Sequence, residues 1–131
     1  MTQMGGCHCG AIRYTVEGEP EHSALCHCGD CTRSAGAPMV GWAMFPVDQV
    51  SIVGTPVTYR SSPPVARLFC GACGTGLFYT NGMAFPGMID IQISTFDDPD
   101  AFPPGAHIQV AEAARWESEA HKLPRFDRFP G

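Results

Sequence analysis

Positive charge is scarce in this sequence. Lys122 is its single lysine, and 8 Lys+Arg against 13 Asp+Glu residues give a net charge of −5. The few basic residues form no run. Because binding to nucleic-acid phosphates requires clustered positive charge, the composition argues against a nucleic-acid partner.

Long apolar runs are also missing. No stretch approaches the ~20 apolar residues that a membrane-spanning helix needs. Residues 1–10 lack the basic region and apolar run of a secretory signal, and no lipidation motif is visible. We therefore expect a cytoplasmic protein with no membrane partner, whose cysteines stay reduced.

Size and turn-forming residues favour a small, mainly β protein. The 131 residues predict one domain, 1–131, with an irregular C-terminal tail over about 121–131. Low charge (16%) with 15 Gly and 12 Pro indicates short strands joined by turns. Alternating or continuous apolar patterns predict strands at 11–16, 39–45, 50–53, 57–60, 65–70, 77–79, 88–95 and 107–111.

Helical structure is expected to be brief. Residues 29–35 lack strand formers and are predicted to wind once, and 112–119 can form a short helix. In the strand predicted at 88–95, isoleucines face one way and Asp90, Gln92 and Ser94 the other. The tail is expected to fold back onto the body through Phe126 and Phe129.

Cysteine is abundant, and it is grouped. The seven cysteines form three tight clusters: Cys7 and Cys9, then Cys26, Cys28 and Cys31, then Cys70 and Cys73. An odd number leaves one thiol over in a complete disulfide framework. In a reduced chain such spacing favours a metal site, with redox disulfides or inert thiols as alternatives. Zinc is the favoured metal, and an all-thiolate iron centre is the minor option.

The number seven suggests two kinds of zinc site. A structural zinc takes four ligands, whereas a catalytic zinc takes three and keeps an open position. Two distant pairs form a closed four-thiolate site most simply, so we expect one zinc at Cys7, Cys9, Cys70 and Cys73 and a second at Cys26, Cys28 and Cys31. In the alternative grouping, one outer cysteine joins the middle cluster.

Glycine follows four of these cysteines. Gly10, Gly29, Gly71 and Gly74 are each preceded by Cys. Where backbone N–H groups turn toward thiolate sulfurs, the chain often needs a positive φ, which glycine tolerates. The pattern therefore strengthens the metal interpretation and predicts positive φ at these glycines.

Other side chains near the middle cluster are candidates for chemistry. Arg33 could compensate the negative charge of three thiolates or hold a substrate carboxylate, although a solvated surface arginine is equally expected. His27 could act as a general base or orient the ligand loop. Asp30 could shuttle a proton or cap backbone N–H groups. The apolar segment with Trp42, Met44 and Phe45 could line a pocket or belong to the core.

Three motifs in order resemble the glutathione-dependent formaldehyde-activating enzyme family, which includes centromere protein V. They are Gly6-Cys7-His8-Cys9-Gly10, then Cys26-His27-Cys28-Gly29-Asp30-Cys31-Thr32-Arg33-Ser34-Ala35-Gly36-Ala37-Pro38, then Phe69-Cys70-Gly71-Ala72-Cys73-Gly74. Weaker similarity continues to Trp116 and to Pro124-Arg125-Phe126. Thr32 stands where the family often has a second Arg, and Gly76 where it often has Pro.

The resemblance implies a zinc-stapled, tent-like β fold with two zinc ions. It implies a structural zinc at the outer four cysteines and a catalytic zinc at Cys26, Cys28 and Cys31. The implied activity is that of a carbon–sulfur lyase resembling S-(hydroxymethyl)glutathione synthase, which joins glutathione to formaldehyde. The alternative is a non-catalytic binding module with both metal sites closed.

Overall fold

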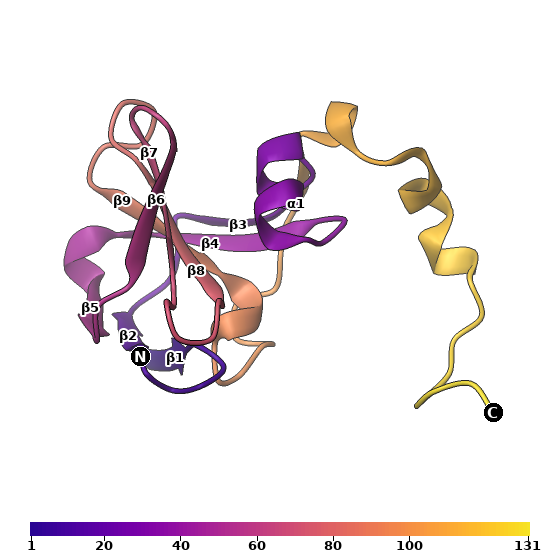
Figure 1. Ribbon diagram of the computed structural model, residues 1–131, viewed down its shortest axis with the longest axis horizontal. Coiled ribbons are helices and arrows are strands. Elements are labelled where there is room, and N and C mark those ends of the chain that lie inside the picture. The colour runs from indigo at the N-terminus through magenta and orange to yellow at the C-terminus, as the bar shows by residue number, and fades with distance from the viewer.

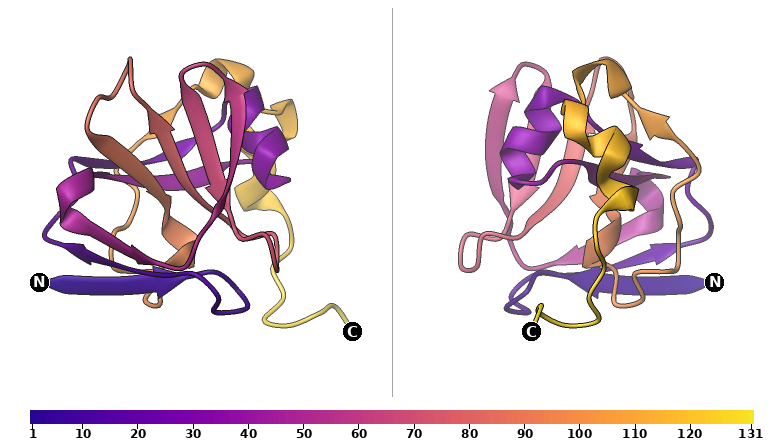
Figure 2. Two further views of the ribbon diagram at one scale, coloured as in Figure 1. Left: turned by 60° about the vertical axis from the view of Figure 1, so that its left-hand side comes forward. Right: turned by 90° about the vertical axis from the view of Figure 1, so that its right-hand side faces the viewer.

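The computed structural model describes all residues, 1–131, as two β-sheets, one α-helix and a C-terminal segment of short 3₁₀ helices (Figure 1). The smaller sheet has the order β1-β2-β5, with β1 at Thr2–Gly6, β2 at Arg13–Glu17 and β5 at Val50–Val53. It forms the base of the molecule beneath the larger sheet (Figure 2).

The larger sheet has seven strands in the order β10-β3-β4-β9-β8-β7-β6. Their bounds are β3 His22–Cys26, β4 Val40–Pro46, β6 Val57–Ser62, β7 Val65–Phe69, β8 Gly76–Asn81, β9 Met88–Gln92 and β10 His107–Ile108. All its pairings are antiparallel except that of β10 with β3. The helix α1, Gly29–Ala35, connects β3 to β4 and ends at Gly36, whose φ is 65°.

The main core lies between the two sheets. Alternation in β2 directs Tyr14 and Val16 inward, where they are 1% and 0% exposed. They pack in one cluster with Phe45 of β4, Phe78 of β8 and Ile91 of β9. Burial of such side chains stabilises the fold by roughly 1.5–3 kcal/mol each. One face of the larger sheet is thereby occupied by core, and the other face remains for the site described below.

The C-terminal segment leaves this body. The 3₁₀ helices Val110–Glu112 and Arg115–Lys122 follow β10, and the chain then runs outward (Figures 1 and 2). Phe126 and Phe129 are 59% and 95% exposed, so the expectation that they fold back onto the body is wrong. Isolated aromatics between prolines and charges bury too little surface to hold the segment down. No helix here has the length and apolar character that a membrane crossing requires.

The mainly β fold predicted from sequence is confirmed, with differences in detail. The strands β1 and β3 were not predicted. The predicted strands 88–95 and 107–111 are too long, because the chain enters 3₁₀ helices at Ile93–Thr95 and Val110–Glu112. The predicted helical turn at 29–35 is the α-helix α1.

Candidate metal centres

Four cysteines converge where two strand pairs turn, and we call them the four-cysteine cluster: Cys7, Cys9, Cys70 and Cys73. The first two follow β1 and the other two lie in the turn from β7 to β8. One sulfur from each lies within 4.8 Å of the other three. The Sγ atoms of Cys7 and Cys9 are 3.7 Å apart, and those of Cys9 and Cys70 are 3.8 Å apart.

These separations fit a tetrahedral zinc. Four sulfurs each about 2.3 Å from one zinc lie about 3.8 Å from one another, whereas bonded disulfide sulfurs lie about 2.05 Å apart. The backbone N–H of Ile12 donates to Cys7 Sγ at 3.2 Å, and that of Cys73 donates to Cys70 Sγ at 3.5 Å. Hydrogen bonds of this kind disperse thiolate charge around a metal.

Two of the four glycines turn the chain as predicted. Gly10 and Gly74 have φ values of 83° and 82°, in the left-handed region. The prediction is wrong for the other two. Gly29 is instead the first residue of α1, and Gly71 is needed for space, because a Cβ there would lie 2.8 Å from Val57 Cγ2.

Thr75 supports the exposed side of this cluster. Its hydroxyl lies 3.2 Å from Cys73 Sγ and accepts a hydrogen bond from the His8 backbone N–H at 3.0 Å. Side-chain and backbone hydrogen bonds from Thr75 lower the pKa of Cys73 to about 5. Cys73 is therefore held as the thiolate, the form that binds metal.

The remaining thiols, the three-cysteine cluster of Cys26, Cys28 and Cys31, come from one short piece of chain. Cys26 ends β3, Cys28 is the N-cap of α1, and Cys31 lies inside its first turns. Their sulfurs lie within 4.8 Å of one another. The Cys31 backbone N–H donates to Cys28 Sγ at 3.2 Å, so the cap of the helix also orients a candidate ligand.

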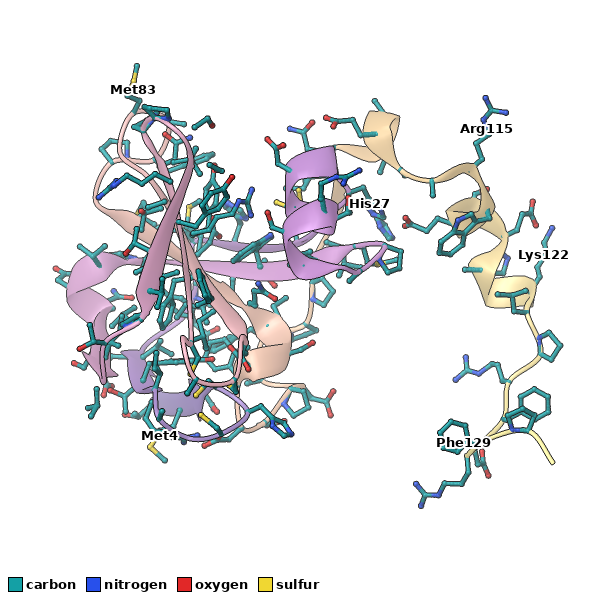
Figure 3. All side chains as sticks on the ribbon, viewed as in Figure 1. Met4, His27, Met83, Arg115, Lys122 and Phe129 are labelled. Atoms are coloured by element: carbon teal, nitrogen blue, oxygen red, sulfur yellow. The ribbon has the colours of Figure 1, made fainter.

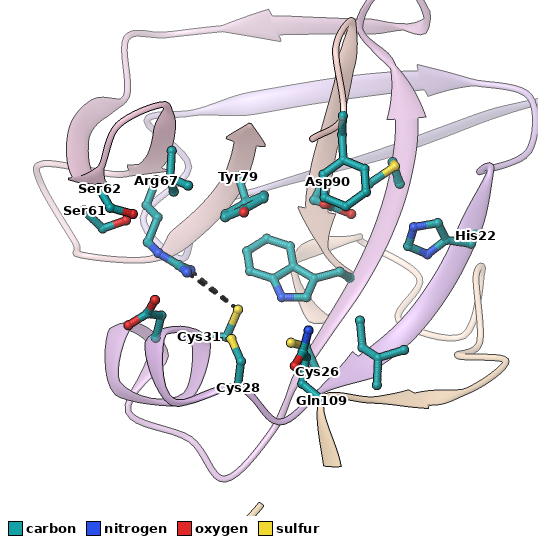
Figure 4. Close-up of a pocket in the computed structure, with 16 residues that line it drawn as sticks. His22, Cys26, Cys28, Cys31, Ser61, Ser62, Arg67, Tyr79, Asp90 and Gln109 are labelled. Atoms are coloured by element: carbon teal, nitrogen blue, oxygen red, sulfur yellow. Dashed lines mark hydrogen bonds between the residues drawn. The ribbon is translucent and has the colours of Figure 1, made fainter. Parts of the chain in front are cut away.

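A cavity of about 200 Å³ opens beside these three sulfurs, between α1 and the free face of the larger sheet (Figure 4). Trp42 and Met44 of β4 and Tyr79 of β8 supply apolar and aromatic walls. Arg67 of β7 and Asp90 of β9 supply charged groups from the sheet side. The four-cysteine cluster contributes no residue to this cavity.

Arg67 points from the sheet at the three-cysteine cluster, as Figure 4 shows. Its Nη1 and Nη2 donate to Cys31 Sγ at 3.8 and 3.7 Å, and its guanidinium lies 5.1 Å from the Tyr79 ring centre. Burial and the neighbouring Cys28 sulfur raise the pKa of Cys31 to about 12, whereas Arg67 lowers it. The arginine thus opposes the cost of placing negative charge on these sulfurs.

Of the other residues predicted near the middle cluster, some line this cavity and others do not. Trp42 and Met44 line the cavity, and Phe45 points the opposite way into the main core. Asp30 lines the cavity from α1. Arg33 is exposed and lines a different cavity, between α1 and the C-terminal segment.

His27 points away from the three sulfurs and toward the C-terminal segment (Figure 3). It is 2% exposed; its Nε2 lies 2.8 Å from His107 Nδ1, and its Nδ1 lies 2.7 Å from Glu117 Oε1. The imidazole therefore links the ligand loop to β10 and to the segment Arg115–Lys122. This arrangement favours the orienting role over the general-base role.

Sequence reasoning missed Arg67 and Asp90. Because side chains alternate along a strand, Arg67 faces away from the side of the sheet on which its neighbour Leu68 packs against the main core. In the same way, Asp90 faces away from the isoleucines of 88–95. The polar face was therefore visible in both strands. No sequence signal showed that α1 and its cysteines cover this face.

Comparison with known proteins agrees with this architecture. Residues 2–112 match the model of a family described as glutathione-dependent formaldehyde-activating enzyme. An uncharacterized lyase, C29B12.13 of Schizosaccharomyces pombe, is 30% identical over 112 residues, which cover 75% of this chain and 82% of the yeast protein. A crystal structure of a Rhodobacter sphaeroides protein, solved as a structural-genomics target, matches with a TM-score of 0.61 and 22% identity over 72% of this chain and 88% of that one. This last likeness supports the fold.

Proposed function

The chain belongs to the glutathione-dependent formaldehyde-activating enzyme family, and we propose that it is a zinc-dependent carbon–sulfur lyase. The reaction joins a small thiol, such as glutathione, to formaldehyde or a related small carbonyl. The observation that carries the proposal is the cavity of about 200 Å³: the three-cysteine cluster lines it, and the four-cysteine cluster contributes no residue to it.

Two zinc ions per chain would be held by the seven thiols. Cys7, Cys9, Cys70 and Cys73 would hold the structural ion, and Cys26, Cys28 and Cys31 the catalytic one. When bound at an open site, zinc supplies Lewis acidity, which favours the thiolate form of a thiol and polarises a carbonyl.

Arg67 supplies the positive charge that this site requires. Three thiolates and one divalent ion sum to one negative charge, which disfavours the approach of an anionic thiolate substrate. The guanidinium beside Cys31 offsets that charge. This role is the one predicted for Arg33, whose own cavity adjoins the C-terminal segment instead.

The walls of the cavity exclude water and orient a substrate. Trp42 and Tyr79, whose ring centres are 5.9 Å apart, flank the space beside the sulfurs. Aromatic walls exclude water, which strengthens electrostatic interactions inside the pocket. Ser61 and Ser62 offer hydroxyl groups at the same cavity for polar parts of a substrate.

The alternative, a non-catalytic module with both metal sites closed, requires a fourth ligand at the three-cysteine cluster. The cluster comprises three thiols without a fourth Cys, His, Asp or Glu side chain. A site with three protein ligands and adjoining space is typical of catalytic zinc. The enzyme proposal is therefore preferred.

A zinc count paired with an assay of adduct formation tests the proposal. The zinc-loaded protein is mixed with glutathione and formaldehyde, and S-hydroxymethylglutathione formation is followed above the spontaneous rate. We expect about two zinc ions per chain and an acceleration that Cys28→Ser abolishes. A two-zinc protein with no acceleration for any small thiol or aldehyde tried would favour the binding module.

A further inference from the structure

Asp90 occupies the centre of a row of side chains on the pocket face of the larger sheet. The strand register pairs Met44 with Asp90, Asp90 with Tyr79, and Tyr79 with Arg67. Directly paired residues of antiparallel strands project from the same face with Cβ atoms about 5 Å apart. The carboxyl group therefore projects into the same cavity as the three sulfurs (Figure 4).

This carboxyl group is buried without full hydrogen bonding. Asp90 is 8% exposed, and its Oδ1 is inaccessible and has no hydrogen-bond partner. Almost all buried side-chain polar atoms in proteins have a partner, and leaving one without costs about 1–3 kcal/mol. A carboxyl group held only for the fold would be expected to be fully hydrogen-bonded, so a carboxyl group left incompletely paired on the cavity wall points to a role in the cavity.

The surroundings of Asp90 favour the protonated acid more than those of an exposed aspartate do. Burial raises its pKa to about 6, and the charge of His22 acts in the opposite direction. Other titratable or charged groups face the same cavity from β7, β8, the end of β3 and α1: Arg67, Tyr79, Cys26, Cys28, Asp30 and Cys31. An acid that titrates close to the working pH can both give and take a proton.

We propose that Asp90 is the proton donor and acceptor of the reaction; this inference rests on the proposed function. In adduct formation the thiolate sulfur bonds to the carbonyl carbon, and the C=O π pair moves to oxygen. Asp90 gives its proton to that oxygen and regains a proton from water, which has taken the one lost by the thiol. In the reverse direction the carboxylate removes the hydroxyl proton as the C–S bond breaks. The step needs no oxidant or further reactant.

Asp90→Asn is the test, because it keeps shape and removes the proton. The matched control is Asp48→Asn, at an exposed aspartate of the 3₁₀ helix Val47–Gln49, outside the cavity. We expect Asp90→Asn to lower kcat by about 100-fold or more, with KM for the thiol within about 3-fold. The pH dependence of kcat near 6 should vanish in this variant, and Asp48→Asn should match the wild type in all three respects.

The outcomes separate the two levels of the proposal. A wild type with no activity overturns the proposed function and this role with it. An active wild type whose kcat and pH profile survive Asp90→Asn overturns only the role of Asp90. A further measurement does not depend on turnover. In ¹³C NMR spectra of protein labelled at aspartate, the Asp90 signal is assigned as the one that the Asp90→Asn variant lacks, and it should titrate near pH 6. A midpoint near 4 would also overturn the inference.

Discussion

The two cysteine clusters present the same candidate ligand atom, a thiol sulfur, in opposite contexts. The four-cysteine cluster ties together turns that are distant in sequence, with Cys9 and Cys70 separated by 61 positions. The three-cysteine cluster lies within one loop and the start of α1, so it joins only segments that are already adjacent in the chain. Cys7 and Cys70 of the first also pack in the main core, whereas the second places sulfurs beside a cavity.

The difference shows that donor chemistry alone does not assign a role to a thiolate site. Connectivity and access decide it. A metal that closes a long loop contributes its binding free energy to folding, of order 10 kcal/mol for structural zinc. A metal held by three neighbouring thiols contributes less to the fold and keeps a position for chemistry.

Loss of the long-range connection should have the largest effect. Cys70 is 2% exposed and belongs to the turn that meets β1, so Cys70→Ser should remove the structural zinc. We expect Tm to fall by more than about 10 °C, because several kcal/mol of metal binding are lost. Metal analysis and thermal melts measure this. A Tm within about 3 °C of the wild-type value would contradict the structural assignment.

Loss of a ligand at the cavity should instead remove turnover and leave the fold. Cys28→Ser should abolish adduct formation and reduce the zinc content to about one per chain, with Tm lowered by only a few degrees. The same melts and metal analysis, with the activity assay, report all three quantities. Equal loss of stability in Cys28→Ser and Cys70→Ser would remove the distinction between the clusters.

A pair of arginine variants sharpens the comparison at the cavity itself. Arg67→Met keeps much of the side-chain volume but removes the charge beside Cys31, and we expect kcat/KM to fall about 10- to 100-fold. Arg33→Met makes the same change on the opposite side of α1 and should alter kcat/KM less than about 2-fold. The reverse order of effects would return the charge-compensating role to Arg33.

A smaller change tests the support around the four-cysteine cluster. Thr75→Val removes the hydroxyl beside Cys73 and should weaken the structural zinc about 10-fold in competition with a chelator. Zinc at the three-cysteine cluster should be unaffected. Thr58→Val, at an exposed position of β6, is the matched control and should change neither affinity.

The grouping of the cysteines into sets of four and three was predictable because cysteine spacing reflects the geometry that a shared metal would need. The buried face of β2 was predictable because alternation in 11–16 is clean, and Tyr14 and Val16 are buried as expected. The β1 strand, Thr2–Gly6, was not, because its two glycines have low strand propensity, and it forms by pairing with β2. Tertiary pairing here overrides local preference.

The cavity was the part that sequence did not reveal. Arg33 lies close to Cys31 in the chain, yet it is exposed and borders another cavity. Arg67 is distant in the chain, yet it contacts the Cys31 sulfur, because β7 and α1 meet across the sheet face. Proximity in sequence was therefore a poor guide to the charged groups, although it was a good guide to the three-cysteine cluster.

Stepwise removal of zinc from the wild type tests the division between the clusters most directly. A chelator is titrated into the loaded protein while zinc content, activity and Tm are followed together. The first zinc to leave should take the activity with it and leave Tm nearly unchanged, and the second should leave only as the protein unfolds. Loss of both ions in one step, or unfolding with the first, would contradict the account.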